Sequence, residues 1–144
     1  MTDGKPSLVL MMGLPGSGKS SYVLEKYKNT HVRLNLDTIK NRDKERVLFF
    51  ACLSVGVNIV IDNTNMSRKT RNRFIPYALA SNYTIEVVHI KTSVDKCIER
   101  VIQRAETSDR EVIPEKGILG LLGQFEPVDM ELENIDTYLE ISGD

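Results

Sequence analysis

Residues 13–20 have the types and spacing of a phosphate-binding loop. Their sequence, GLPGSGKS, matches the pattern G-x-x-x-x-G-K-[ST] and follows an apolar run. Glycines let backbone N–H groups turn toward phosphate oxygens, and a following helix adds the positive end of its dipole. We expect Lys19 to reach the β- and γ-phosphates and Ser20 to be a magnesium ligand. The loop therefore predicts a site for ATP, or another nucleoside triphosphate, with Mg²⁺.

Two acids lie where predicted strands end. Asp37 follows the run at residues 31–36, and Asp62 closes the run at residues 58–62. Because parallel strands end at one edge of a sheet, both acids should lie beside the phosphates. Asp37 could deprotonate an attacking hydroxyl, or cap a helix that begins at Thr38, and the two roles can coexist. Asp62 is the candidate to hold magnesium, and Asn63 after it is interpreted as a turn former.

Cations gather in two segments. The cluster of Arg68, Lys69, Arg71 and Arg73 is either a solvated helix face or a site for an acceptor phosphate. Arg100, Arg104 and Arg110 flank a polar stretch that we interpret as a lid, over about residues 104–114. Position favours Arg104 as the cation that closes on the triphosphate, whereas Arg110 is expected in solvent. The candidate nucleotide ligands are Gly13, Pro15, Gly16, Ser17, Gly18, Lys19, Ser20, Arg100 and Arg104.

The pattern of apolar residues predicts an α/β fold. Strands are expected at Leu8–Met12, His31–Leu36, Asn58–Asp62 and Thr84–Ile90. Helices are expected at Lys19–Tyr27, Thr38–Val55, Ser67–Ser81, Ser93–Ala105 and from Val112 to about Gln124. Ser67 and Ser93 should cap their helices, and Pro76 should interrupt one. The prediction is a doubly wound parallel sheet of four to five strands, with helices on both faces and a short helical lid.

Composition fits one soluble domain over residues 1–144. Hydrophobic residues make up 41% and charged residues 27%, and no apolar stretch approaches the roughly 20 residues of a membrane span. Without a signal-peptide pattern, we expect a cytoplasmic protein with no membrane partner. Cys52 and Cys97 suggest neither a disulfide nor zinc, and His31 and His89 are expected to be structural.

Charge is distributed unevenly along the chain. All 19 Lys and Arg lie at or before Lys116 with 13 of the 20 acids, so the body carries +6 and the last 28 residues −7. Such blocks are typical of a polyanion-binding body or a solvated tail. We interpret residues 126–144 as a solvated acidic segment.

Four segments resemble the kinase domain of the polynucleotide 5′-hydroxyl kinases of phages and animals, within the P-loop kinase group. They are residues 13–20, Asn35-Leu36-Asp37, residues 61–65 (IDNTN) with Arg68, and Arg100-x-x-x-Arg104 followed by residues 112–114 (VIP). The resemblance implies phosphorylation of DNA or RNA 5′ ends, with Asp37 as general base and Arg100 and Arg104 on the donor phosphates.

The acceptor site departs from this pattern. Lys40 stands where some polynucleotide kinases carry an acceptor-binding Arg, so the acceptor candidates are Lys40, Arg68 and Arg71. Two other functions stay open, a kinase for a nucleoside or other small molecule and a nucleotide-binding regulator or hydrolytic switch. The leading hypothesis is an ATP/Mg²⁺-dependent phosphotransferase acting on nucleic acid 5′ ends, and the sequence does not indicate an oligomeric state.

Overall fold

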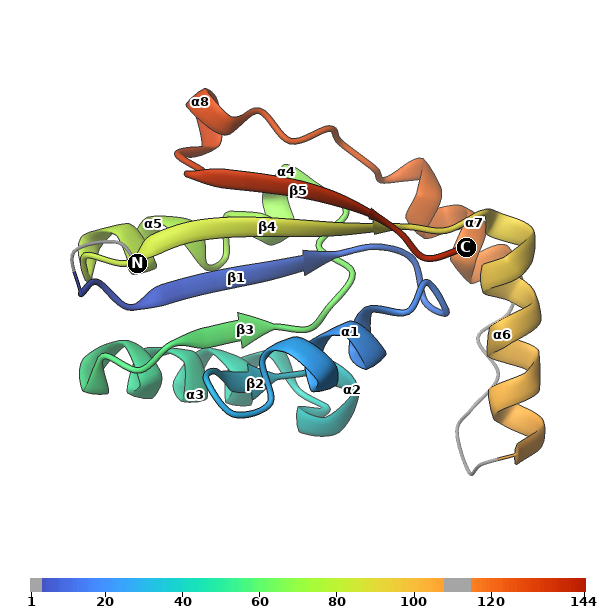
Figure 1. Ribbon diagram of the computed structural model, residues 1–144, viewed down its shortest axis with the longest axis horizontal. Helices are drawn as coiled ribbons and strands as arrows, with labels where there is room; N and C mark the ends of the chain where they lie inside the picture. Colours follow the sequence, from blue (N-terminus) through green and yellow to red (C-terminus); the bar gives the residue numbers. More distant parts are fainter. Residues whose placement is uncertain (1–3, 108–114) are drawn as a thin grey trace.

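Five parallel strands form the centre of the computed structural model, which describes residues 4–107 and 115–144 (Figure 1). In chain order they are β1 (Ser7–Met12), β2 (Val32–Leu34), β3 (Ile59–Ile61), β4 (Thr84–Lys91) and β5 (Thr137–Ser142). Across the sheet the order is β2-β3-β1-β4-β5. The predicted parallel α/β fold is confirmed, and β1, which leads into the loop, lies at its centre.

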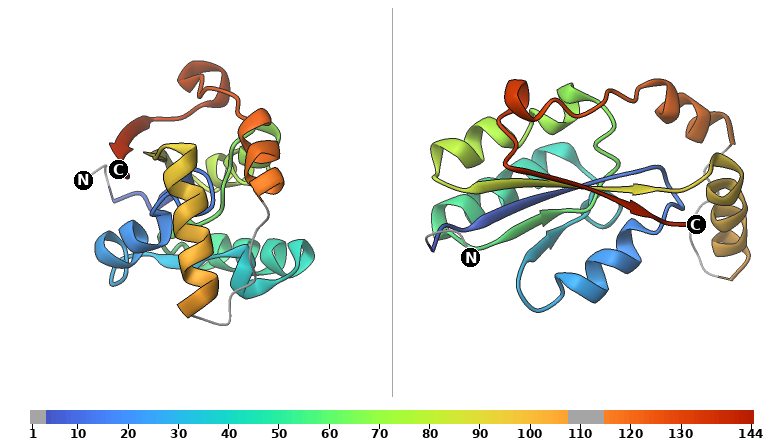
Figure 2. Two further views of the ribbon diagram at one scale, coloured as in Figure 1. Left: turned by 90° about the vertical axis from the view of Figure 1, so that its right-hand side faces the viewer. Right: turned by 45° about the horizontal axis from the view of Figure 1, so that its top comes forward.

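Helices connect the strands and cover the sheet (Figure 2). They are α1 (Lys19–Lys26), α2 (Leu36–Ile39), α3 (Arg42–Val55), α4 (Arg68–Arg71), α5 (Ile75–Ala80), α6 (Val94–Thr107), α7 (Glu115–Gly123) and α8 (Met130–Glu133). Alternate residues of β1 enter different apolar clusters, so the strand is buried on both faces: Leu8 and Leu10 face one cluster, Val9 and Met11 the other. Among the described residues, no helix has the length and apolar character to cross a membrane.

Two helices that the sequence predicts as continuous are each divided. The stretch after Asn35 breaks because Lys40 adopts a left-handed conformation, with φ of 74°, and ends α2. The Asn41 side chain then accepts bonds from the N–H groups of Asp43 and Lys44, which caps α3. In the other stretch Ser67 caps α4, as predicted, and Pro76 lies in the first turn of α5.

The acidic segment at residues 126–144 is not a solvated tail. Its residues Thr137–Ser142 form β5, which pairs in parallel with β4 along its whole length. Several of its acids hydrogen-bond to the body: the Asp136 carboxylate accepts the N–H of Ile85 at 2.8 Å, and Asp144 accepts the N–H of Ser93 at 3.1 Å. The prediction was wrong because the net charge of a segment does not indicate which acids have partners in the fold.

Arg71 joins the C-terminal segment to the core. The side chain is fully buried, and its Nε donates to Glu133 Oε1 at 2.7 Å. The other guanidinium nitrogens donate to the carbonyl oxygens of Asn65, Met66 and Glu126 at 3.0–3.2 Å. A guanidinium enclosed in this way cannot reach an acceptor, so the prediction of Arg71 as an acceptor ligand is corrected to a structural role.

We expect Arg71→Met to lower the free energy of unfolding by about 3–5 kcal/mol, because the substitution removes the guanidinium that bonds both oxygens of the largely buried Glu133 carboxylate. Urea unfolding followed by circular dichroism measures the change. Arg73→Met, at an exposed position nearby, is the control and should change stability by less than about 0.5 kcal/mol. A loss below about 1 kcal/mol for Arg71→Met would contradict the structural role.

Candidate functional site

The phosphate loop connects β1 to α1. Two of its N–H groups donate within the protein, that of Gly13 to the Thr64 carbonyl and that of Ser17 to the Leu14 carbonyl, both at 3.1 Å. Gly16 and Gly18 have φ of 81° and 106°, in the left-handed region that favours glycine. A Cβ on Gly16 would lie 2.5 Å from the carbonyl oxygen of Cys97, so α6 also excludes any side chain there. Helix α1 begins after Gly18 without a side-chain cap. The N–H groups of its first turn therefore have no intrahelical partner and suit an anion.

The carbonyl groups of the loop, in contrast, have protein partners. Arg100 Nη1 donates to the carbonyls of Gly16 at 3.2 Å and Ser17 at 3.3 Å, and Thr92 Oγ1 donates to Ser17 at 2.7 Å. Arg100 Nη2 donates to the carbonyl of Gly143, beyond β5, at 2.6 Å. In this arrangement Arg100 supports the loop from behind, and its contact with donor phosphates stays a prediction.

Lys19 lies inside the loop that it follows. Its buried ammonium donates to the Leu14 carbonyl at 2.7 Å and lies 3.4 Å from Ser17 Oγ. Burial lowers the pKa of Lys19 to about 8, and the charges of Asp62 and Asp37 oppose this effect. The ammonium is therefore held where it could turn from one carbonyl toward a phosphate.

Ser20 and Asp62 meet at the start of α1 and the end of β3. Ser20 Oγ donates to Asp62 Oδ2 at 3.0 Å, and the carboxylate is 1% exposed. Its other oxygen, Oδ1, is buried without a hydrogen-bond partner. A hydroxyl, a carboxylate and an unsatisfied oxygen fit Mg²⁺, which takes one or two protein ligands and completes its shell with phosphates and water. Within the described parts of the chain, no three His, Cys, Asp or Glu converge as a metal cage.

Arg33 is a member of this site that sequence reasoning missed. From β2, its Nε donates to Asp62 Oδ2 at 2.9 Å, and its Nη2 lies 2.8 Å from the same oxygen. Nη2 also donates to Ser20 Oγ at 3.3 Å. The available signal was a charged residue inside an expected strand, two positions before Asn35.

Asn35 and Asn63 connect the segment after β2 to the segment after β3. Asn35 Nδ2 donates to the Asp62 carbonyl at 2.6 Å, and Asn63 Oδ1 accepts the N–H of Leu36 at 2.9 Å. Asn63 Nδ2 donates to Glu45 of α3 at 2.8 Å. Asn63 lies in a bend of the chain, and its side chain is also a tether that the sequence did not predict. The network holds α2 against the end of β3.

Asp37 is the second residue of α2 and is exposed. The cap of this helix is Asn35, whose side chain accepts the N–H of Thr38, so the capping role predicted for Asp37 is wrong. The carboxylate is close enough to Lys19 for its charge to raise the lysine pKa. Lys40, exposed and left-handed, ends the same short helix three residues later.

A cavity of about 680 Å³ adjoins the outer side of the phosphate loop. The loop, α1, α6 and the residues around the end of β5 line it, and they include Gly16, Tyr22, Arg100, Arg104 and Ser142. The charge of Arg104 lowers the pKa of Lys19, so the two cations are close enough to repel each other. Arg104 is in α6, whereas Arg110 and the predicted lid residues 108–114 lie outside the described residues.

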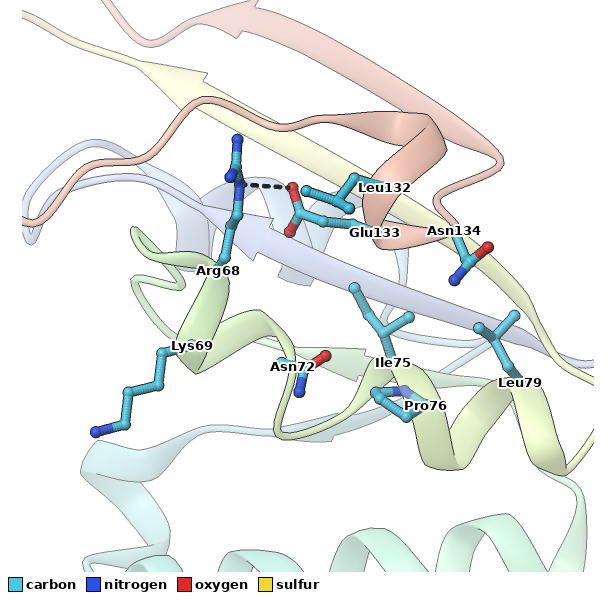
Figure 3. A pocket seen from close by; sticks show the side chains of 9 residues that line it. All are labelled: Arg68, Lys69, Asn72, Ile75, Pro76, Leu79, Leu132, Glu133 and Asn134. Carbon is cyan, nitrogen blue, oxygen red and sulfur yellow. Dashed lines mark ion pairs between the residues drawn. The ribbon is translucent and has the colours of Figure 1, made fainter.

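Arg68 lines a different cavity, of about 350 Å³, between α4, α5 and α8 (Figure 3). Its Nε lies 3.9 Å from Glu133 Oε2, and the side chain points toward α8. Lys69 extends away from Glu133. The structure thus directs Arg68 toward the C-terminal segment, and an acceptor contact by this residue stays a prediction.

Comparison with known proteins agrees with the motifs. A putative bifunctional polynucleotide phosphatase/kinase of Acanthamoeba polyphaga mimivirus is 36% identical over 80 residues, covering 55% of this chain and 19% of that protein. The bifunctional polynucleotide phosphatase/kinase of Schizosaccharomyces pombe is 24% identical over 120 residues, covering 83% of this chain and 29% of its own length. The chain therefore spans less than a third of either relative.

A solved structure shares the fold over nearly the whole chain. Chaetomium thermophilum Kti12, in complex with ADP-AlF3, is 17% identical with a TM-score of 0.71, covering 95% of this chain and 89% of that one. The AAA domain family model, AAA_33, matches residues 8–128. The resemblance to polynucleotide kinases is confirmed at the level of the family, and the chain belongs to the AAA_33 family of AAA domains.

Proposed function

We propose that this protein is a kinase that transfers the γ-phosphate of ATP, or a related triphosphate, to the 5′-hydroxyl of DNA or RNA. One observation carries the proposal: Lys19, Asp62 and Asp37 follow β1, β3 and β2, three neighbouring strands, and their charges interact beside the uncapped start of α1. A cation for phosphates, an acid for magnesium and an exposed acid for a proton are what phosphoryl transfer needs.

Each residue has a distinct task in this reaction. The N–H groups of the loop and Lys19 hold the β- and γ-phosphates, while Ser20 and Asp62 would hold Mg²⁺, which when bound neutralises charge on the phosphate oxygens. Asp37 accepts the proton of the acceptor hydroxyl as its oxygen attacks the γ-phosphorus in line. The bond to the β–γ bridging oxygen then breaks, and a nucleoside diphosphate leaves. Arg104 adds positive charge from the adjoining cavity.

The polynucleotide acceptor is supported by the two relatives, whose names state polynucleotide kinase activity. Lys40 is the proposed acceptor contact, because it is exposed three residues after Asp37 and its left-handed backbone is unusual for a residue with a side chain. A left-handed residue with a side chain persists only where the surrounding structure holds it. Here the left-handed Lys40 ends α2, the helix that carries the proposed base Asp37.

An acceptor panel tests the proposed function. With γ-labelled ATP and Mg²⁺, we expect label on 5′-hydroxyl DNA or RNA and none on the same oligonucleotides carrying a 5′-phosphate. The KM for the oligonucleotide should rise steeply with salt, because cations that contact a polyanion release counterions. Label only on small alcohols would indicate a metabolite kinase, and release of inorganic phosphate alone would indicate a hydrolytic switch.

Asp37→Asn should lower kcat for transfer by about 100- to 10,000-fold, the usual contribution of a general base. The Kd for nucleotide, measured by calorimetry, should change by less than about twofold, since the proposed role of Asp37 is to accept the acceptor's proton. Asp43→Asn, at an exposed acid in the first turn of α3, is the matched control. Loss of nucleotide binding in Asp37→Asn with unchanged turnover per bound nucleotide would contradict the role of base.

Nucleotide affinity should fall as the pH rises above about 8. The pKa of Lys19 in the free protein is about 8, and a polyphosphate binds the protonated form. Affinity should therefore be constant below this pH and decrease by up to about tenfold per pH unit above it, until the pKa in the complex is passed. Lys19→Arg, which stays protonated, should give a flat profile, and a flat profile in the unaltered protein would contradict the account.

A further inference from the structure

The Arg33 guanidinium contacts both side chains that fit a magnesium ion, and these two are also bonded to each other. Two of its nitrogens are within 2.9 Å of Asp62 Oδ2, and one is 3.3 Å from Ser20 Oγ. The cation therefore contacts both protein groups that the proposed metal site would use. A divalent ion bound to either oxygen of this carboxylate would lie close to the guanidinium, and the like charges would repel each other.

The two sides of this ion pair differ in their exposure. The Asp62 carboxylate is 1% exposed, whereas the Arg33 side chain is 33% exposed and starts from β2, a strand at the edge of the sheet. An ion buried in this way needs a partner, since an uncompensated charge in the interior is costly. The arginine, in contrast, can move into solvent along its flexible side chain. The pair is thus suited to exchange one cation for another.

We propose that Arg33 is a resident counter-cation of Asp62 that Mg²⁺ displaces when it enters with the nucleotide. This inference rests on the proposed function only in naming a magnesium nucleotide as the ligand. Before the metal arrives, Arg33 keeps the carboxylate neutralised and places positive charge beside Ser20, at the start of α1. It therefore weakens metal binding and strengthens binding of a metal-free triphosphate.

The unsatisfied oxygen of Asp62 supports this exchange. Arg33 and Ser20 both use Oδ2, and Oδ1 is buried without a partner. The arginine thus compensates the charge of the carboxylate while leaving part of its hydrogen-bonding capacity unused. A hydrated Mg²⁺ ion could satisfy Oδ1 through one of its coordinated waters, which the arginine does not do.

Binding of the metal alone tests the proposal without nucleotide or activity. Mn²⁺, followed by electron paramagnetic resonance, is the probe, and Arg33→Met should raise its affinity by about tenfold, as expected when one competing charge-assisted contact is removed. Arg33→Lys keeps a cation and should stay close to the unaltered protein. Arg46→Met, which removes an exposed charge from α3, should change Mn²⁺ affinity by less than about twofold.

Calorimetry with ATP provides the second readout. In EDTA, Arg33→Met should bind ATP about tenfold more weakly, whereas with Mg²⁺ the loss should disappear or reverse. Equal Mn²⁺ affinity in Arg33→Met and the unaltered protein, with native thermal unfolding, would overturn the proposal. If neither protein bound ATP or phosphorylated any acceptor, the proposed function would fail, and the Mn²⁺ comparison would still decide the role of Arg33.

Discussion

The site depends on an unequal distribution of hydrogen-bond partners around one loop. Lys19 donates to the Leu14 carbonyl, Arg100 to the Gly16 carbonyl and Thr92 to the Ser17 carbonyl. Helix α1, in contrast, starts without a side-chain cap. Buried carbonyls and N–H groups both need partners, so a protein that bonds these carbonyls and leaves the N–H groups at the start of α1 open is built to receive an anion. The rest of the fold serves to keep this loop in place.

Distant parts of the chain contribute to that constraint. Helix α6 passes so close to Gly16 that only glycine fits, and the segment after β5 reaches the loop through Gly143, beside the Ser17 carbonyl and the Thr92 hydroxyl, where a Cβ has no room. The segment after β5 therefore packs against the loop, while β5 itself belongs to the sheet. The buried Arg71 holds the same C-terminal segment at its other end, through Glu133 and Glu126.

The sequence predicted what depends on local pattern. The loop motif, the four predicted strands and the acids that follow two of them lie where expected, because strand and loop signals depend on neighbouring residues. Partners that meet only in the folded chain could not be predicted. From the sequence, Arg71 was an acceptor candidate or a solvated cation, the acidic segment was a tail, and the contact of Asn63 with Glu45 had no signal. The role of Arg33 was not predicted for the same reason, because its partner, Asp62, is 29 residues away in the sequence.

The most direct test of the account is a crystal structure with Mg²⁺ and a non-hydrolysable ATP analogue. The account predicts the β- and γ-phosphates within the loop, on the N–H groups at the start of α1, with the Lys19 ammonium moved from the Leu14 carbonyl to a phosphate oxygen. An analogue bound outside the loop, with the Lys19 ammonium still bonded to the Leu14 carbonyl, would contradict the account.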